Sequence, residues 1–186
     1  RLLGQHKPKT SGSNQMLSNP VRSRRLFAMK TVATEKLTRD QVKLVDASIA
    51  ALETAYNPYS GYFVGAAVRN RRGAIFSASN VENAAYGSTI CAERMAIGKA
   101  NSHGARDIVA LAVSARSDDF DKGEITSGPC GSCRQVIYEL SQVSGCDIEI
   151  ILATADKTSV AVTSIEELLP YAFGPKQLQM NISKYA

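Results

Sequence analysis

The sequence predicts one α/β domain in which a mixed sheet lies between helices on both faces. After residue 37, helical and strand patterns alternate in the order α-β-β-α-β-α-β-β-α, an order that requires helices on both sides of a sheet. Two of the expected strands, 108–113 and 148–153, are continuous apolar runs, typical of strands buried on both faces. Five strand patterns in all predict a three-layer α-β-α architecture with a mostly five-stranded sheet.

The first helix is expected to begin near Thr38 and to extend to about Tyr56. Thr38 and Gln41 fit a capping box, in which two side chains bond to each other's backbone N–H groups. Apolar residues then recur at helical spacing until Asn57-Pro58. The residue before a proline avoids helical geometry, so this helix must end there.

The remaining elements follow from local patterns. The segments 62–68 and 74–81 read as two strands joined by the turn 70–73, which predicts a hairpin. We expect helices at 90–100, 130–140 and 165–169, and further strands at 108–113, 148–153 and 160–162.

The net charge of +5 over 186 residues comes from the start of the chain. Residues 1–30 carry seven Lys or Arg and no Asp or Glu, and the rest has net charge −2. Residues 1–36 therefore read as a basic, flexible leader, either an organelle transit segment or an appended tail, and 37–186 as the catalytic domain. A folded part without excess positive charge does not favour a nucleic acid polymer as partner.

The apolar runs and the cysteines indicate in which cellular compartment the protein is expected. No apolar run approaches the roughly 20 residues that cross a bilayer, so no membrane partner is expected. Four cysteines are too few for a disulfide scaffold, and two of them stand as Cys-x-x-Cys, a spacing typical of metal or redox sites. A reducing compartment, the cytoplasm, is the expected location.

Two short segments carry the chemistry. Residues 91–94 read Cys-Ala-Glu-Arg, and residues 129–134 read Pro-Cys-Gly-Ser-Cys-Arg. Cys91, Cys130 and Cys133 are three thiolate ligands, the number that a catalytic zinc ion takes from protein. Glu93 lies on the same helical turn as Cys91 and is placed to carry protons as a general acid and base.

Three thiolates give a zinc site a formal charge of −1, which has to be offset. The positive ends of two helix dipoles would point at the cysteines, and Arg94 could donate hydrogen bonds to their sulfurs, as could Arg134. The less favoured alternative is that Arg94 is a solvated helix charge. A structural zinc knot would need a fourth ligand, and a redox dithiol would need neither Cys91 nor Glu93.

At this point the chain resembles a family. Cys-Ala-Glu-Arg followed by Pro-Cys-x-x-Cys resembles the signature of zinc-dependent deaminases. The wider set of matches resembles the small homotetrameric cytidine deaminases, over about residues 40–178. These matches are Pro58-Tyr59-Ser60, Val64-Gly65-Ala66-Ala67, Asn80-Val81-Glu82-Asn83-Ala84, Tyr86-Gly87, 91–94, 129–135, Leu168-Leu169-Pro170 and Phe173-Gly174-Pro175.

The resemblance implies a cytidine-deaminase-like fold, one Zn²⁺ per subunit and hydrolysis of cytidine and deoxycytidine to the uracil nucleosides and ammonia, in pyrimidine salvage. It implies that Asn80 and Glu82 hold the ribose 3′-hydroxyl. Alone, these two residues could instead cap the turn after a strand. The resemblance also implies further contacts to the nucleoside: the backbone of Ala92 at the pyrimidine edge, Tyr62 packed on the base, Tyr86, and Phe173 reaching into the site of a neighbouring subunit of a homotetramer.

Three rival functions remain open. A deaminase of polynucleotides usually has His as the first ligand and adds basic and aromatic channels, whereas this chain has Cys91 and no Trp. A blasticidin-type deaminase is a nearer rival. Asn80 and Glu82 argue against it, because they favour a substrate with a ribose. A catalytically silent zinc module would not need Glu93.

Overall fold

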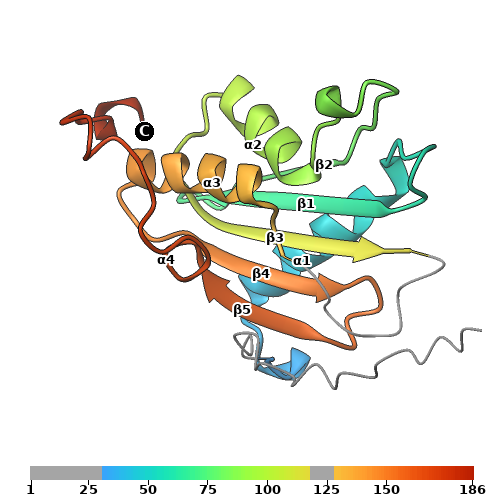
Figure 1. Cartoon of the computed structure of the whole chain (residues 1–186). Helices are drawn as coiled ribbons and strands as arrows, with labels where there is room; N and C mark the ends of the chain where they lie inside the picture. The colour runs from blue at the N-terminus through green and yellow to red at the C-terminus, as the bar shows by residue number, and fades with distance from the viewer. Residues whose placement is uncertain (1–30, 118–127) are drawn as a thin grey trace, which may run out of the picture.

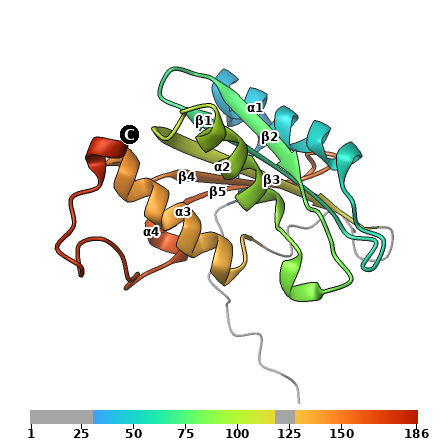
Figure 2. The same ribbon diagram turned by 90° about the horizontal axis from the view of Figure 1, so that it is seen from above.

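The computed structural model describes residues 31–117 and 128–186. These residues form a five-stranded sheet with helix α1 on one face and helices α2 and α3 on the other (Figures 1 and 2). The three-layer α-β-α prediction and the order of the elements are confirmed. The helices are α1 (Arg39–Ala51), α2 (Ala92–Ser102), α3 (Gly131–Ser144) and α4 (Ile165–Leu168), and the strands are β1 (Phe63–Asn70), β2 (Ile75–Ser79), β3 (Ile108–Arg116), β4 (Glu149–Thr154) and β5 (Val160–Ser164).

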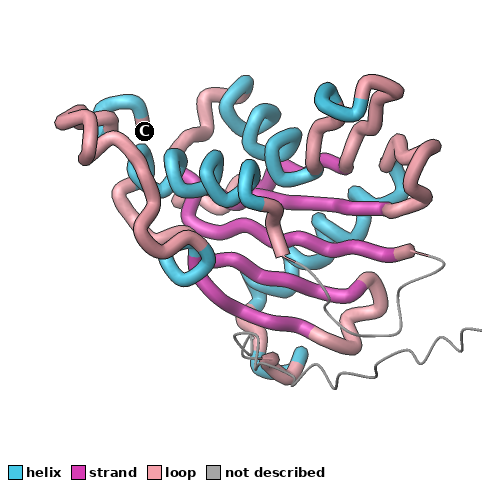
Figure 3. Tube along the Cα trace, viewed as in Figure 1, coloured by secondary structure: helices cyan, strands magenta, loops and turns pink. Residues whose placement is uncertain are grey.

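The sheet is mixed, with strand order β2-β1-β3-β4-β5 (Figure 3). Strands β3 and β4 are parallel, and the other three pairings are antiparallel. A parallel pair needs a crossover connection, and α3 lies in the connection between β3 and β4. Helices α2 and α3 consequently lie side by side on one face, in the views of Figures 1 and 2.

Alternate residues of the central strands supply two separate cores. Along β4, Ile150 and Leu152 pack with the buried face of α3, whereas Ile151 and Ala153 pack with Leu44 of α1. Side chains of a strand point to opposite faces in turn, so a strand covered on both faces has to be apolar throughout. This arrangement confirms the interpretation of the runs 108–113 and 148–153.

Helix α1 lies unusually close to the middle of the sheet. A Cβ atom placed on Gly65 of β1 would lie 2.0 Å from the carbonyl oxygen of Ser48 in α1. The face of the sheet beneath α1 is built largely of small residues, including Ala67 and Ala112, which are fully buried. The absence of a side chain at residue 65 is therefore what lets the helix backbone approach the strand.

The predicted ends of the elements are correct at some positions and wrong at others. The capping box of Thr38 and Gln41 is present in full. Helix α1 ends at Ala51 and a 3-10 turn follows, so Tyr56 lies outside it; the Tyr56 N–H bonds to the Asn80 carbonyl instead. Helix α3 continues to Ser144, where Gly145 ends it with φ of 64°, the left-handed geometry common at helix C-termini.

The segment before α1 lies along the outer edge of β5. The N–H of Val32 donates to the carbonyl of Val160, and the hydroxyl of Thr34 donates to the carbonyl of Lys157. Residues 31–36, part of the expected leader, thus contact the sheet, while residues 1–30 lie outside the described residues. The domain boundary at residues 36 and 37 stays a prediction. In the described parts of the chain, no helix is both long enough and apolar enough to cross a membrane.

Candidate metal centre

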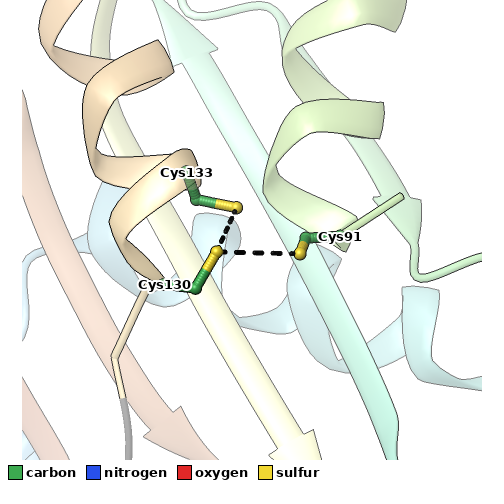
Figure 4. A group of neighbouring side chains, drawn as sticks. All are labelled: Cys91, Cys130 and Cys133. Atoms are coloured by element: carbon green, nitrogen blue, oxygen red, sulfur yellow. Dashed lines mark hydrogen bonds between the residues drawn. The ribbon is translucent and has the colours of Figure 1, made fainter. Parts of the chain in front are cut away.

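The N-termini of α2 and α3 bring the three predicted cysteines together (Figure 4). Cys91 is the N-cap of α2, Cys130 is the N-cap of α3, and Cys133 lies in the first turn of α3. The sulfur atoms of Cys91 and Cys130 are 3.9 Å apart, and those of Cys130 and Cys133 are 3.5 Å apart. All three sulfurs lie within 4.8 Å of one another.

This geometry fits a tetrahedral zinc ion. Zn–S bonds of about 2.3 Å at tetrahedral angles place two ligand sulfurs about 3.8 Å apart. Thiolates are the soft donors that select zinc among the common divalent ions. Both helices also direct the positive ends of their dipoles at the sulfurs, which stabilises negative charge there. The three cysteines are therefore able to hold Zn²⁺.

The thiols of Cys91 and Cys133 shift each other's pKa in opposite directions. A hydrogen bond from Cys133, together with contacts to Cys130 and Arg94, lowers the pKa of Cys91 to about 5 despite partial burial. The same hydrogen bond, together with burial and the charge of Glu93, raises the pKa of Cys133. Of these two thiols, Cys91 is consequently the one that more readily carries negative charge.

Arg94 lies beside Cys91. Burial lowers its pKa, but the hydrogen bond with Cys91 and the cysteine charges raise it overall. Its Nη2 donates to the carbonyl of Thr89 at 3.1 Å, and its buried Nε has no hydrogen-bond partner among the described residues. The guanidinium is thus anchored at one end and retains a buried donor near the cluster.

Glu93 is buried against the cysteines, with 4% of its surface exposed. Loss of hydration is the main cause that raises the pKa of Glu93, and the neighbouring charge of Cys91 raises it further. Because Cys133 is close enough to hydrogen-bond to it, the carboxylate lies at the cluster rather than turned away. A carboxyl group with a raised pKa beside a metal site is suited to accept and release a proton.

Arg134 binds backbone carbonyls on both sides of it. Its Nε donates to the carbonyl of Pro129 at 2.7 Å, and its Nη1 donates to the carbonyl of Leu168 at 3.0 Å. The side chain therefore ties the segment that precedes Cys130 to the end of α4. These two bonds hold the backbone beside a predicted ligand in place, and a bond from Arg134 to sulfur stays a prediction.

Asn80 and Glu82 follow β2, and both fix local backbone. The Asn80 side chain accepts from the N–H of Val64 and donates to the carbonyl of Tyr62, each at 3.0 Å. The Glu82 carboxylate accepts from the N–H groups of Tyr59 and Ser60 at 3.0 and 3.2 Å. Both side chains thus hold the backbone of the segment that leads into β1, and each retains unused hydrogen-bonding positions.

Ser60 belongs to the matched segment Pro58-Tyr59-Ser60, but the sequence assigned it no role. Its hydroxyl donates to Oε1 of Glu82 at 2.5 Å and accepts from the N–H of Tyr62 at 3.0 Å. This bond is the main reason that the pKa of Glu82 lies below its ordinary value; partial burial opposes it, and the N–H groups of Tyr59 and Ser60 reinforce it. A serine in a turn favours side-chain bonding, but a partner 22 residues away leaves no local pattern in the sequence.

The other predicted substrate contacts lie on different elements. Ala92 is buried in the first turn of α2, between Cys91 and Glu93. Tyr86 is 74% exposed and its ring stacks edge-on with Tyr59 at 6.0 Å. Phe173 is 60% exposed, and its carbonyl accepts from Gln135 of α3. The Phe173 side chain is therefore largely open to solvent in the single chain.

The chain matches a known family and known proteins. The family model for the cytidine and deoxycytidylate deaminase zinc-binding region matches residues 38–146. A cytidine deaminase of Halalkalibacterium halodurans is 42% identical over 134 residues, which are 72% of this chain and 94% of that protein. A blasticidin-S deaminase of Bacillus cereus is 31% identical over 143 residues, 75% of this chain and 96% of that protein.

The fold also matches solved structures. The crystal structure of cytidine deaminase from Burkholderia pseudomallei has a TM-score of 0.63 and 41% sequence identity, and the match covers 74% of this chain and all of that one. A cytidine deaminase structure from Mycobacterium tuberculosis has a TM-score of 0.58 and 31% identity, covering 74% and 99%.

Proposed function

The chain belongs to the zinc-binding cytidine and deoxycytidylate deaminase family, and from this premise we propose how its residues act on a nucleoside. It is a zinc-dependent hydrolase that deaminates cytidine, and we extend the substrates to deoxycytidine and the role to pyrimidine salvage. The observation that carries the proposal is the grouping of three cysteine sulfurs within 4.8 Å, with the buried carboxyl group of Glu93 against them.

Cys91, Cys130 and Cys133 would hold the metal ion, as the three protein ligands of a catalytic zinc site. Zn²⁺ bound there supplies the Lewis acidity that activates water for hydrolysis. Arg94 and the helix N-termini offset the negative charge of the three thiolates. Arg134 keeps the backbone of Cys130 in position through its bonds to Pro129 and Leu168.

Glu93 moves the protons. Hydrolysis removes a proton from water and adds one to the departing amine, so a single carboxylate between the two can accept the first and donate it onward. Burial, which raises the pKa of Glu93, favours retention of that proton between the two steps. Its place in α2 next to the ligand Cys91 supports this role.

The nucleoside is recognised by residues around the cluster. We assign the 3′-hydroxyl of the sugar to Asn80 and Glu82, whose side chains retain free acceptor and donor positions. The backbone of Ala92 contacts the pyrimidine edge, and Tyr62 packs on the base. Tyr86 and Phe173 contact substrate as well, Phe173 in the site of a neighbouring subunit of a homotetramer, which its exposure in the single chain supports.

The proposal also covers the size of the substrate, the partners and the location of the enzyme. The substrate is a small nucleoside, and the partners are other copies of the chain rather than a nucleic acid polymer or a membrane. We place the enzyme in the cytoplasm, with organelle targeting by the basic leader as the alternative. Sizing of the zinc-loaded protein tests the assembly: four chains support the shared site, and a stable, active monomer contradicts it.

The activity is tested by following the ultraviolet absorbance of cytidine incubated with the zinc-loaded protein, before and after chelation. We expect Glu93→Ala to retain zinc and to lose at least about 10²-fold in kcat, the typical contribution of a general acid-base. The matched control is Glu166→Ala, an exposed glutamate of α4, which should leave the rate unchanged.

The same assay separates the rivals. Turnover of blasticidin S with none of cytidine would overturn the nucleoside assignment, and turnover of a cytidine-containing oligonucleotide alone would indicate a polynucleotide enzyme. A protein that binds zinc and turns over none of these substrates would be a silent zinc module.

A further inference from the structure

A loop of five residues holds the carboxylate of Glu82 through three donors. The loop spans residues 57–61 and closes with a bond from the Gly61 N–H to the Asn57 carbonyl. Two of its N–H groups and the Ser60 hydroxyl donate to the carboxylate, at 2.5–3.2 Å. The orientation of this carboxylate therefore depends on the loop rather than on β2, which ends at Ser79.

The hydroxyl of Ser60 has a fixed direction. A serine hydroxyl has one proton to donate and two acceptor positions. The N–H of Tyr62 occupies an acceptor position and an ionised carboxylate can only accept, so the proton is committed to Glu82. Ser60 thereby links Glu82 to Tyr62, and Asn80 links Tyr62 to Val64.

These hydrogen bonds connect the residues assigned to the sugar with the residue assigned to the base. Under the proposed function, Glu82 and Asn80 contact the sugar, while Tyr62 packs on the base. Ser60 lies between the two groups and bonds to one residue of each. Because Ser60 is itself exposed, its polar contacts rather than its packing give it a role.

We propose that Ser60 is a positioning residue for sugar recognition: its hydroxyl directs the Glu82 carboxylate toward the 3′-hydroxyl of the nucleoside and fixes its distance from Tyr62. The inference rests on the proposed function and refines its substrate class. A fixed anionic acceptor favours a free 3′-hydroxyl and repels a 3′-phosphate, so it selects free nucleosides over internal nucleotides of a polymer.

The test compares Ser60→Ala with the wild type, both zinc-loaded, on cytidine and on 3′-deoxycytidine. We expect kcat/KM for cytidine to fall on the order of tenfold, mostly through KM, because a hydrogen bond to a charged group is lost. On 3′-deoxycytidine the fall should shrink to less than about twofold, because the sugar no longer offers the group that Glu82 accepts. Ser60→Thr, which keeps the hydroxyl, should recover most of the loss.

The control is Ser102→Ala, an exposed serine whose hydroxyl bonds within α2. It should leave both substrates unaffected. A second readout is a double-mutant cycle, in which Ser60→Ala has no added effect once Glu82→Gln is present. Thermal unfolding of each variant checks that the fold is retained.

The outcomes distinguish a failure of the proposed deaminase function from a failure of the role of Ser60. If the wild type does not deaminate cytidine, the proposed function is wrong and this inference falls with it. If the wild type is active, then equal losses by Ser60→Ala on both substrates, no loss on cytidine, or additive effects with Glu82→Gln would each overturn the role of Ser60 alone.

Discussion

Arg94 contacts Cys91 through its guanidinium. A hydrogen bond from Cys133 is the main cause that lowers the pKa of Cys91 to about 5, and the contact with Arg94 lowers it further, so the guanidinium stabilises negative charge on that sulfur. We expect Arg94→Ala to keep the fold and the zinc but to lower kcat by about 10- to 100-fold, the range typical for groups that support metal ligands. Steady-state kinetics with a metal count per chain measures both.

Arg72, an exposed residue of the hairpin turn, offers the matched comparison for loss of a positive charge. Arg72→Ala should behave as the wild type. Unchanged kinetics in Arg94→Ala would remove Arg94 from the mechanism and leave the helix dipoles as the source of compensation.

The lowered pKa of Glu82 predicts that substrate binding depends on pH. The Ser60 hydroxyl is the main cause that lowers the pKa of Glu82, so the carboxylate stays ionised, and able to accept, to a lower pH than an ordinary glutamate. In Ser60→Ala the pKa of Glu82 rises toward its ordinary value. We therefore expect the acid limb of the plot of 1/KM against pH to move to higher pH in this variant.

The lowered pKa of Glu82 also makes the free energy of unfolding depend on pH. Since the pKa of Glu82 is lower in the folded chain, its contribution to the free energy of unfolding is present above the ordinary glutamate pKa and is lost as pH falls through the folded-state pKa. A gap between wild type and Ser60→Ala that grew as pH fell would contradict this account.

The residues of the site differ in how far the sequence reveals them. Cys91 and Glu93, or Cys130 and Cys133, are neighbours on one helical turn, so spacing alone places them together. Ser60 with Glu82, and Arg134 with Leu168, are separated by 22 and 34 residues. Their pairing is decided by how loops meet in the folded chain, and no local periodicity records it.

At the scale of elements, the closest packing is that of α1 on β1. Gly65→Ala would place a methyl group 2.0 Å from a backbone oxygen of α1, and the helix would have to move away from the sheet. We expect the free energy of unfolding to fall by about 3 kcal/mol, at the upper end for overpacking. Chemical denaturation measures it.

Gly98→Ala is the matched control, because a Cβ at this position in α2 meets nothing within 4 Å. Alanine is the better helix former, so this variant should gain about 0.5–1 kcal/mol. If the two substitutions shifted stability equally, the close approach of α1 would not be a determinant of the fold.

The elements themselves were predictable where the pattern is local. The capping box at Thr38 and the alternation of the buried strands gave the right types and order. The predicted end of α1 is wrong because Tyr56 fits the helical spacing, yet its backbone pairs with Asn80 and Val81, which follow β2. Tertiary hydrogen bonds of this kind override periodicity.

At the scale of the whole molecule, residues 31–36, which the sequence assigns to the leader, contact the folded part of the chain. A chain that begins at Leu37 loses the bonds of Val32 to Val160 and of Thr34 to Lys157. At about 1 kcal/mol for each hydrogen bond, we expect it to be about 2 kcal/mol less stable than a chain that begins at Thr31, as measured by urea denaturation. Equal midpoints would instead support a domain that begins at residue 37.

The metal centre joins parts of the chain that are distant in sequence. Cys91 and Cys130 are 39 residues apart, and β3 lies between them in sequence. An ion held by both acts as a cross-link, which lowers the entropy of the unfolded chain and by mass action favours the folded one. The unfolding temperature of this protein should then rise with the concentration of free zinc. Loss of zinc would therefore lower the amount of folded enzyme as well as its activity.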